Sequence, residues 1–285
     1  MRNLLRLMMQ LAIAGLLFIC LAQTGARYLF GRTVRREVEA LLAGLHAQTP
    51  ATITEKEIAA LPAPVQRWLH RAGVVDRQDP LAARICQRGS LRTGAQRPWL
   101  PFSAVEYYTT QRPGLVWHAQ WPLAPLLLAE ARDRYFRGRG HMLVKALSLF
   151  TMTDARGPEM DQGALVRYLN GIMWVPHAAI TPYITWQAVD EHTARATIHY
   201  GAVTAAALFT FDAEGDCARM EAQRYRYEGN RFVLRRWSTV AEAHEEFQGI
   251  RIPVRGQAVW HLEEGEFPYV QIEVREIQYH VTAPC

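Results

Sequence analysis

The chain has 285 residues, 49% of them hydrophobic and 21% charged, which excludes disorder over most of its length and allows a large buried core. Its 32 lysines and arginines outnumber its 27 acidic residues by five, and the arginines fall in short, scattered clusters. We therefore expect no nucleic-acid partner.

The N-terminus carries a targeting or anchoring signal. Residues 7–22 are apolar except for Gln10, and with Leu4 and Leu5 the run approaches the roughly 20 residues that span a bilayer. Residues 24–26, Thr-Gly-Ala, resemble a small-x-small cleavage site, so a cleaved signal segment is the alternative to a transmembrane helix. We assign residues 1–26 to a membrane anchor or signal segment.

Residues 27–60 are predicted to form an amphipathic helical lead-in. Val34, Val38, Leu41 and Leu45 fall on one helical stripe, with charged residues elsewhere on the helix. A second, short helix should follow through residue 60. Its start is marked by a capping box, in which Thr54 is followed three positions later by Glu57.

A further helix is predicted over residues 61–73. Pro62 and Pro64 suit a first helical turn, and Gly73 suits the end of the helix. From about residue 82 the apolar period changes to that of strands. Segments 83–92, 99–110, 115–121, 126–136 and 141–150 are separated by turns with Gly or Pro, which predicts an antiparallel meander.

The alternation of apolar and polar residues returns after residue 193 and continues almost to the end of the chain. It changes phase near Arg275 and Glu276, and also between Ala222 and Tyr225, which predicts bulges or sharp twists. Such strands suit a strongly curved sheet. No repeat or linker divides the sequence, so we predict a single domain over residues 61–285.

The clearest helical signal within the strand-rich region spans residues 157–176 and divides the strands into two halves. Leu165, Leu169, Ile172 and Met173 share a stripe that would face the sheet, as a buried plug or as a lid. We therefore predict an α+β fold: a long curved antiparallel β-sheet, or half-barrel, with an interrupting helix and N-terminal helices.

Four segments together resemble an uncharacterised bacterial family, a domain of unknown function often preceded by a membrane helix: residues 61–69, 133–142, 153–160 and 167–176. The likeness spans roughly residues 61–280. It implies an acidic residue after Asn170, where this chain has Gly171. The order of elements also looks similar to periplasmic lipoprotein-carrier-like half-barrels, which implies an apolar ligand site.

The resemblance also bears on localisation. Four arginines follow the apolar run against two before it, which by the positive-inside tendency argues against simple export. The family resemblance instead implies an uncleaved anchor in the inner membrane, with the domain periplasmic or extracytoplasmic within the cell envelope. Secretion after signal cleavage and a cytoplasmic-facing domain are the alternatives.

Catalytic and metal-binding motifs are absent from the sequence. None of the ten histidines forms an i, i+4 pair, and no CxxC pair or nucleophile motif occurs. We expect no metal and no cofactor. Asp154, Glu159 and Asp161 suit charge matching to a helix N-terminus, with a cryptic hydrolase as the less favoured alternative. Cys86 and Cys217 suit free thiols or a disulfide.

Aromatic residues are the most informative set. Tryptophans recur through the region of the sheet and its helix, where core packing explains most of them and a concave, apolar binding face is the alternative. The predicted hydrophobic lining consists of Trp99, Trp117, Trp121, Leu165, Leu169, Ile172, Met173, Trp174, Trp186 and Trp260.

The function favoured by these patterns is a non-catalytic envelope protein that binds a lipid or another hydrophobic ligand on the concave face of its sheet. Its partners would be the membrane, through the N-terminal segment, and the hydrophobic small molecule. The alternative from another class is a structural or protein-interaction module whose concave face is filled by its own side chains.

Overall fold

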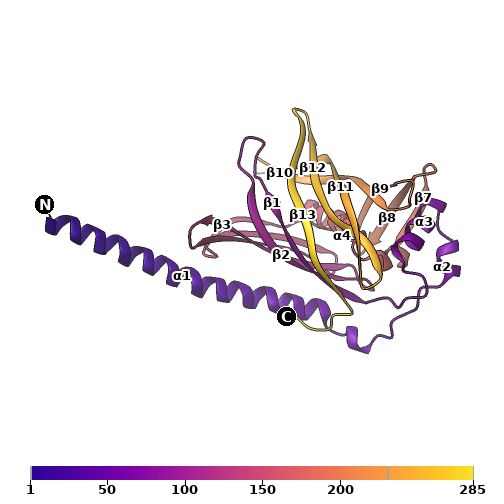
Figure 1. The fold of residues 1–285 in the computed structure, drawn as a ribbon, viewed down its shortest axis with the longest axis horizontal. Coiled ribbons are helices and arrows are strands. Elements are labelled where there is room, and N and C mark those ends of the chain that lie inside the picture. The colour runs from indigo at the N-terminus through magenta and orange to yellow at the C-terminus, as the bar shows by residue number, and fades with distance from the viewer. Residues whose placement is uncertain (1, 230, 285) are drawn as a thin grey trace.

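The computed structural model describes residues 2–229 and 231–284. Within them, thirteen antiparallel strands form one curled sheet, with a long helix on its outer face and another helix inside the curl (Figure 1). The helices are α1 (Arg2–Leu42), α2 (Glu55–Ala59), α3 (Ala63–Ala72) and α4 (Pro158–Gly171), with short 3-10 turns at Leu45–Ala47 and Pro176–Ile180.

The strands follow one another as two meanders on either side of α4. The first contains β1 (Ala82–Leu91), β2 (Leu100–Thr109), β3 (Gly114–Ala124), β4 (Leu127–Phe136), β5 (Arg139–Ala146) and β6 (Phe150–Ala155). The second contains β7 (Ile184–Ala188), β8 (Thr193–Tyr200), β9 (Val203–Phe211), β10 (Cys217–Glu228), β11 (Arg231–Phe247), β12 (Ile250–Leu262) and β13 (Gly265–Tyr279).

Pairing of β1 with β13 joins the two meanders, so that β6 and β7 lie at opposite edges of the sheet. Because α4 connects these two edges, the chain must cross the concave side, and the sheet curls around the helix. The predicted fold class is therefore confirmed: an α+β half-barrel with an interrupting helix and N-terminal helices.

The register confirms one predicted irregularity and corrects another. Cys86 pairs with Glu276 and Gln87 with Val274, which leaves Arg275 as an extra residue, a bulge where a phase change was predicted. The phase change predicted between Ala222 and Tyr225 is wrong. Pairing of β10 with β11 is regular there, and the irregularity in β10 lies next to Cys217 instead.

The strand predicted over residues 141–150 is in fact parts of two strands, β5 and β6. Between them the chain turns through Leu147 and Ser148, both with left-handed backbones (φ 55° and 56°). Non-glycine residues seldom adopt this conformation. The turn contains no glycine or proline, so its residue types do not mark it in the sequence. The predicted capping box is present, since the backbone nitrogen of Thr54 donates to Glu57 Oε2 at 2.8 Å.

Helix α4 forms much of the core inside the curl. Leu165, Leu169 and Ile172 have no exposed surface. The Tyr168 ring stacks on that of Tyr108 with centroids 4.5 Å apart, and the Tyr168 hydroxyl donates to the Thr109 carbonyl. Burial of side chains this large contributes about 1.5–3 kcal/mol each to folding. These three residues of the predicted stripe are therefore part of the core, whereas Met173 of the same stripe borders a cavity described below.

Helix α1 has two halves with different surroundings. From Phe30 to Leu42 its apolar stripe packs on the convex face of the sheet, against residues such as Tyr107 and Val116. Its N-terminal half projects away from the domain (Figure 1) and buries none of its most apolar stretch. Among the described residues, α1 is the one helix long and apolar enough to cross a membrane.

Candidate functional site

A cavity lies between α4 and the concave face of the sheet. Its volume is about 960 Å³, including the part open to solvent, and most of its exposed lining is apolar. Strands from both meanders contribute: β2 to β5 from the first and β10 to β13 from the second. The apolar lining comprises Trp117, Met142, Met173, Trp174, Trp237, Val240, Ala241, Pro253, Val254, Ala258, Val270 and Ile272.

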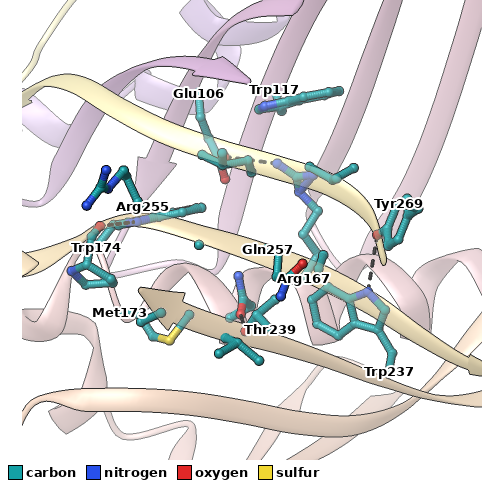
Figure 2. Close-up of a pocket in the computed structure, with 18 of the residues that line it drawn as sticks. Glu106, Trp117, Arg167, Met173, Trp174, Trp237, Thr239, Arg255, Gln257 and Tyr269 are labelled. Atoms are coloured by element: carbon teal, nitrogen blue, oxygen red, sulfur yellow. Dashed lines mark hydrogen bonds and ion pairs between the residues drawn. The ribbon is translucent and has the colours of Figure 1, made fainter. Parts of the chain in front are cut away.

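Opposite walls of the cavity are aromatic. Figure 2 shows Met173 and Trp174, just after α4, on one side and Trp237 and Tyr269 on the other. The indole nitrogens are tied down, since Trp174 Nε1 donates to the Pro253 carbonyl at 3.0 Å and Trp237 Nε1 donates to the Tyr269 hydroxyl at 3.2 Å. These hydrogen bonds satisfy the polar atom of each indole and fix the orientation of both rings.

Of the ten residues predicted as lining, Trp117, Met173 and Trp174 border the cavity. The others lie elsewhere: Leu165, Leu169 and Ile172 in the core, Trp260 buried beside Trp237, Trp186 against Trp68 and Phe209, Trp121 in an apolar cluster near the end of β3, and Trp99 under the Arg92 guanidinium. Rings on the concave face thus divide between the core and the cavity.

A buried charge cluster forms one end of the cavity and was not anticipated. Arg167 of α4 donates from Nη2 to Glu106 Oε2 at 2.9 Å and from Nη1 to Asp133 Oδ2 at 3.5 Å. The two carboxylate side chains are 1% and 0% exposed. The Arg167 guanidinium also lies 4.9 Å from the Trp117 ring centroid, and Trp117 Nε1 donates to Gln87 Oε1.

This cluster holds two acids and one base, and burial and mutual charge interactions shift their pKa values. Burial raises the pKa of Glu106 above its usual range, although the Arg167 guanidinium opposes the rise. Burial would lower the pKa of Arg167, but the carboxylates of Glu106 and Asp133 outweigh it and raise that pKa. Asp133 Oδ1 has no hydrogen-bond partner among the described residues. The cluster is a positioned polar group at the end of an otherwise apolar space.

Two further arginines line the cavity without a carboxylate partner among the described residues. Arg224 is only 9% exposed, and its Nε donates to the Gly163 carbonyl at 3.0 Å. Its guanidinium lies 4.8 Å from the Trp237 ring centroid and within 3.5 Å of the Tyr269 hydroxyl. Arg255 is an exposed part of the lining. Both add positive charge to the lining of the cavity.

Residues 51–272, more than three quarters of the chain, match a family described as a family of unknown function, DUF6544. The chain belongs to this family. No curated protein sequence matches it. The resemblance inferred from the sequence is thus confirmed, and membership of DUF6544 assigns no activity to the cavity.

Solved structures with similar folds come from other families. A putative outer membrane lipoprotein-sorting protein domain from Vibrio parahaemolyticus is 7% identical, with 81% of this chain and 94% of that chain covered and a TM-score of 0.38. A LolA superfamily protein from Nitrosomonas europaea is 11% identical, with 75% and 93% covered and a TM-score of 0.36.

A DUF1329 family protein from Desulfovibrio piger is 12% identical, with 82% and 96% covered and the same TM-score of 0.36. All three scores lie below 0.5. The function proposed below for this DUF6544 chain therefore rests on its own cavity.

The acidic residues near the start of α4 lie outside the cavity lining. Asp154 contacts His141 Nε2 at 2.8 Å and pairs with Arg156, whose hydrogen bond contributes most to lowering the Asp154 pKa. Asp161 accepts from the Gly140 nitrogen and from Arg139, which fixes the β4–β5 turn to the helix. Glu159 and Asp161 stand in the first helical turn, where they match the helix dipole.

The cysteines complete the candidates. Cys217 is a buried free thiol and forms no disulfide with Cys86. Burial raises the pKa of the Cys217 thiol well above its usual range, which makes a nucleophilic thiolate there unfavourable. No group of three or more His, Cys, Asp or Glu residues suited to a metal ion occurs in the described part of the chain.

Proposed function

We propose that this protein binds an amphipathic lipid or similar hydrophobic ligand in the cavity between α4 and the sheet. Its apolar part would lie between the Trp174 and Trp237 walls, and its negatively charged end would pair with Arg224. The observation that carries the proposal is an apolar cavity whose wall includes this buried arginine, with no carboxylate partner among the described residues. Each methylene group removed from water contributes about 0.8 kcal/mol to binding.

The charge of Arg224 makes the ligand class more specific. A buried guanidinium held only by neutral acceptors and ring faces is incompletely compensated, because burial removes its water. A carboxylate or phosphate oxygen beside it would supply a charge-assisted hydrogen bond of about 1.5–3 kcal/mol. We therefore expect a preference for an acidic ligand over its neutral ester.

The test uses the full chain in detergent and a fluorescent fatty acid, cis-parinaric acid, with its methyl ester as the neutral comparison. We expect saturable binding of both, with the acid bound about 10-fold or more tightly. Arg224→Gln should abolish that preference, whereas Arg195→Gln, an exposed arginine on β8, should not. Ala241→Trp places a large side chain in the cavity and should weaken the binding of both the acid and the ester.

Native mass spectrometry of the same sample should find an apolar molecule carried through purification. Protein that never retains such a molecule and shows no saturable probe binding would overturn the proposal. That outcome would favour the structural module instead, for which the filled region around Leu165 and Leu169 is the supporting observation.

We also propose that α1 is an uncleaved membrane anchor and that the domain is extracytoplasmic. Residues 24–26 lie within a continuous helix, between Gln23 and Phe30, both of which are buried against the sheet. Cleavage after residue 26 would remove Gln23, whose side chain is hydrogen-bonded to the backbone of Leu126 and Leu128. Expression with a C-terminal alkaline phosphatase fusion and measurement of the mature mass test both parts. A product lacking residues 1–26, or an inactive phosphatase, would contradict them.

A further inference from the structure

Two neighbouring hairpin tips expose large apolar side chains. At the β3–β4 tip, Leu123 is 49% and Leu126 is 75% exposed. At the β5–β6 tip, Leu149 is 41%, Phe150 is 63% and Met152 is 68% exposed. Tips of hairpins in water usually carry polar turn residues, so five such side chains together mark a contact surface.

The two tips form one patch. Ala129 of β4 pairs with Ala146 of β5, and beyond that pair the Leu147 nitrogen donates to the Leu128 carbonyl at 2.8 Å. The β3–β4 and β5–β6 tips therefore lie side by side at the same end of the sheet. We call these five exposed residues, Leu123, Leu126, Leu149, Phe150 and Met152, the tip patch.

Helix α1 leaves the domain beside the tip patch. The Gln23 side chain is buried, donates to the Leu126 carbonyl at 2.8 Å and accepts from the Leu128 nitrogen at 2.9 Å. These two bonds fasten the β3–β4 tip to the helix, and Figure 1 shows the end of β3 beside the middle of α1. On the N-terminal side of Gln23 the helix is apolar and exposed.

The length of that apolar part sets the level of the tips. Residues 4–22 rise about 28 Å as a helix, close to the roughly 30 Å hydrocarbon thickness of a bilayer. With this stretch in the membrane, Gln23 stands at the membrane–water boundary. The tip patch, fastened to Gln23, then lies at the same level.

We infer that the tip patch is a second membrane contact, inserted into the leaflet surface that α1 enters. The partner is a lipid bilayer, because the patch is continuous with the apolar half of α1 and stands at the depth where apolar side chains meet the headgroups. Lys145 lies on the same hairpin, two residues before the turn at Leu147, where it can meet lipid phosphates.

The patch also leads toward the cavity. Trp117, Ala119 and Trp121 alternate along β3 within one apolar cluster that also contains Phe102 and Ala131. Trp117 borders the cavity, and Leu123 of the tip patch lies on β3 two residues after Trp121. We assign this row as the route by which a lipid passes between bilayer and cavity, a step that rests on the proposed ligand binding.

Membrane contact is tested by thiol labelling of the full chain in nanodiscs, with one chain per disc. A charged maleimide should modify Leu126→Cys and Phe150→Cys at least 10-fold more slowly than Val189→Cys, an exposed apolar position in the β7–β8 turn. Peptide-level mass spectrometry separates each new site from the native cysteines. Equal rates at all three positions would overturn the inference, and would leave a protein partner as the occupant of the patch.

The route is tested separately by transfer of cis-parinaric acid from phosphatidylcholine vesicles. Leu123→Glu should slow transfer at least 5-fold without changing affinity for the probe in detergent, and Tyr227→Glu, at an exposed site on β10, should change neither. If Leu123→Glu binds the probe normally and its transfer rate is unchanged, the route is contradicted, whereas the membrane contact and the ligand binding are not. If the wild-type chain binds no probe in detergent, the proposed function is contradicted, whatever the result of the thiol labelling.

Discussion

Replacement of Arg167 by methionine removes the cation that, among the described residues, pairs with the buried carboxylates of Glu106 and Asp133. The distances of 2.9 and 3.5 Å show that both acids depend on it, and neither has more than 1% of its side chain exposed. Loss of one partner from such a group destabilises by about 3–5 kcal/mol, because uncompensated charge stays buried. For a chain of this size the melting temperature should fall by roughly 6–20 °C.

The loss should depend on pH in a defined direction. Burial raises the pKa of Glu106 above its ordinary 4.5, so the folded state keeps this proton to a higher pH than the unfolded state does. Below about pH 4.5 the carboxyl is protonated in both states, and stability falls as pH rises above that value. Arg167 opposes the raised pKa, so its removal makes the fall steeper. The difference from wild type should be smallest near pH 4 and grow toward pH 7.

Circular dichroism melts of the full chain in detergent at several pH values measure both effects. Arg195→Met, at an exposed position, is the matched control and should melt with the wild type. Adding Glu106→Gln to the Arg167→Met variant should restore part of the loss, since it removes one of the two stranded charges. A variant within about 2 °C of wild type at pH 7, or a difference that does not change with pH, would refute the reasoning.

Two other predictions concern the core. Gly171→Ala should lower the free energy of unfolding by about 1–3 kcal/mol, because the new Cβ would stand 2.5 Å from Tyr108 Cε2. Gly31→Ala, which has open space around it, is the control and should not lower it. Urea unfolding midpoints measure both variants. Burial lowers the pKa of His177 to about 3, so the unfolded state takes up a proton below pH 6.5 that the folded state does not. His177 alone should contribute a loss of about 2 kcal/mol between pH 7 and pH 5, so the stability of His177→Leu should fall by that much less than the stability of the wild type over this range. An acid response unchanged by that substitution would count against buried, neutral His177.

Local patterns predicted much of the fold. Strand alternation, the capping box at Thr54 and the bulge at Arg275 each depend on residues near one another in sequence, where the physical rules are short-range. The β5–β6 turn was missed because its conformation does not follow from the residues near it in sequence. Leu147 and Ser148 adopt left-handed backbones that their residue types do not announce, and the surrounding pairing imposes them.

The cavity was harder to predict because its parts meet only through the curl. The stripe of Leu165, Leu169 and Ile172 indicated which face of α4 turns inward, yet periodicity could not separate a filled region from a hollow one. The charge cluster had one usable signal. Glu106 shares strand parity with the buried Tyr108, which places its carboxylate on the inner face, but the partner Arg167 lies 61 residues away.

Helix α1 continues without a break from its apolar half into the half that packs on the sheet, and Gln23 fastens it at the junction. As the proposed anchor, α1 would hold the domain in a fixed orientation, because the helix is continuous from Arg2 to Leu42 and is hydrogen-bonded to the sheet through Gln23. Such a domain would stay within its own width of the membrane surface. With anchoring and ligand binding as proposed, the ligand would be exchanged only with a membrane or protein in direct contact with the domain, and not by diffusion of the protein across an aqueous gap.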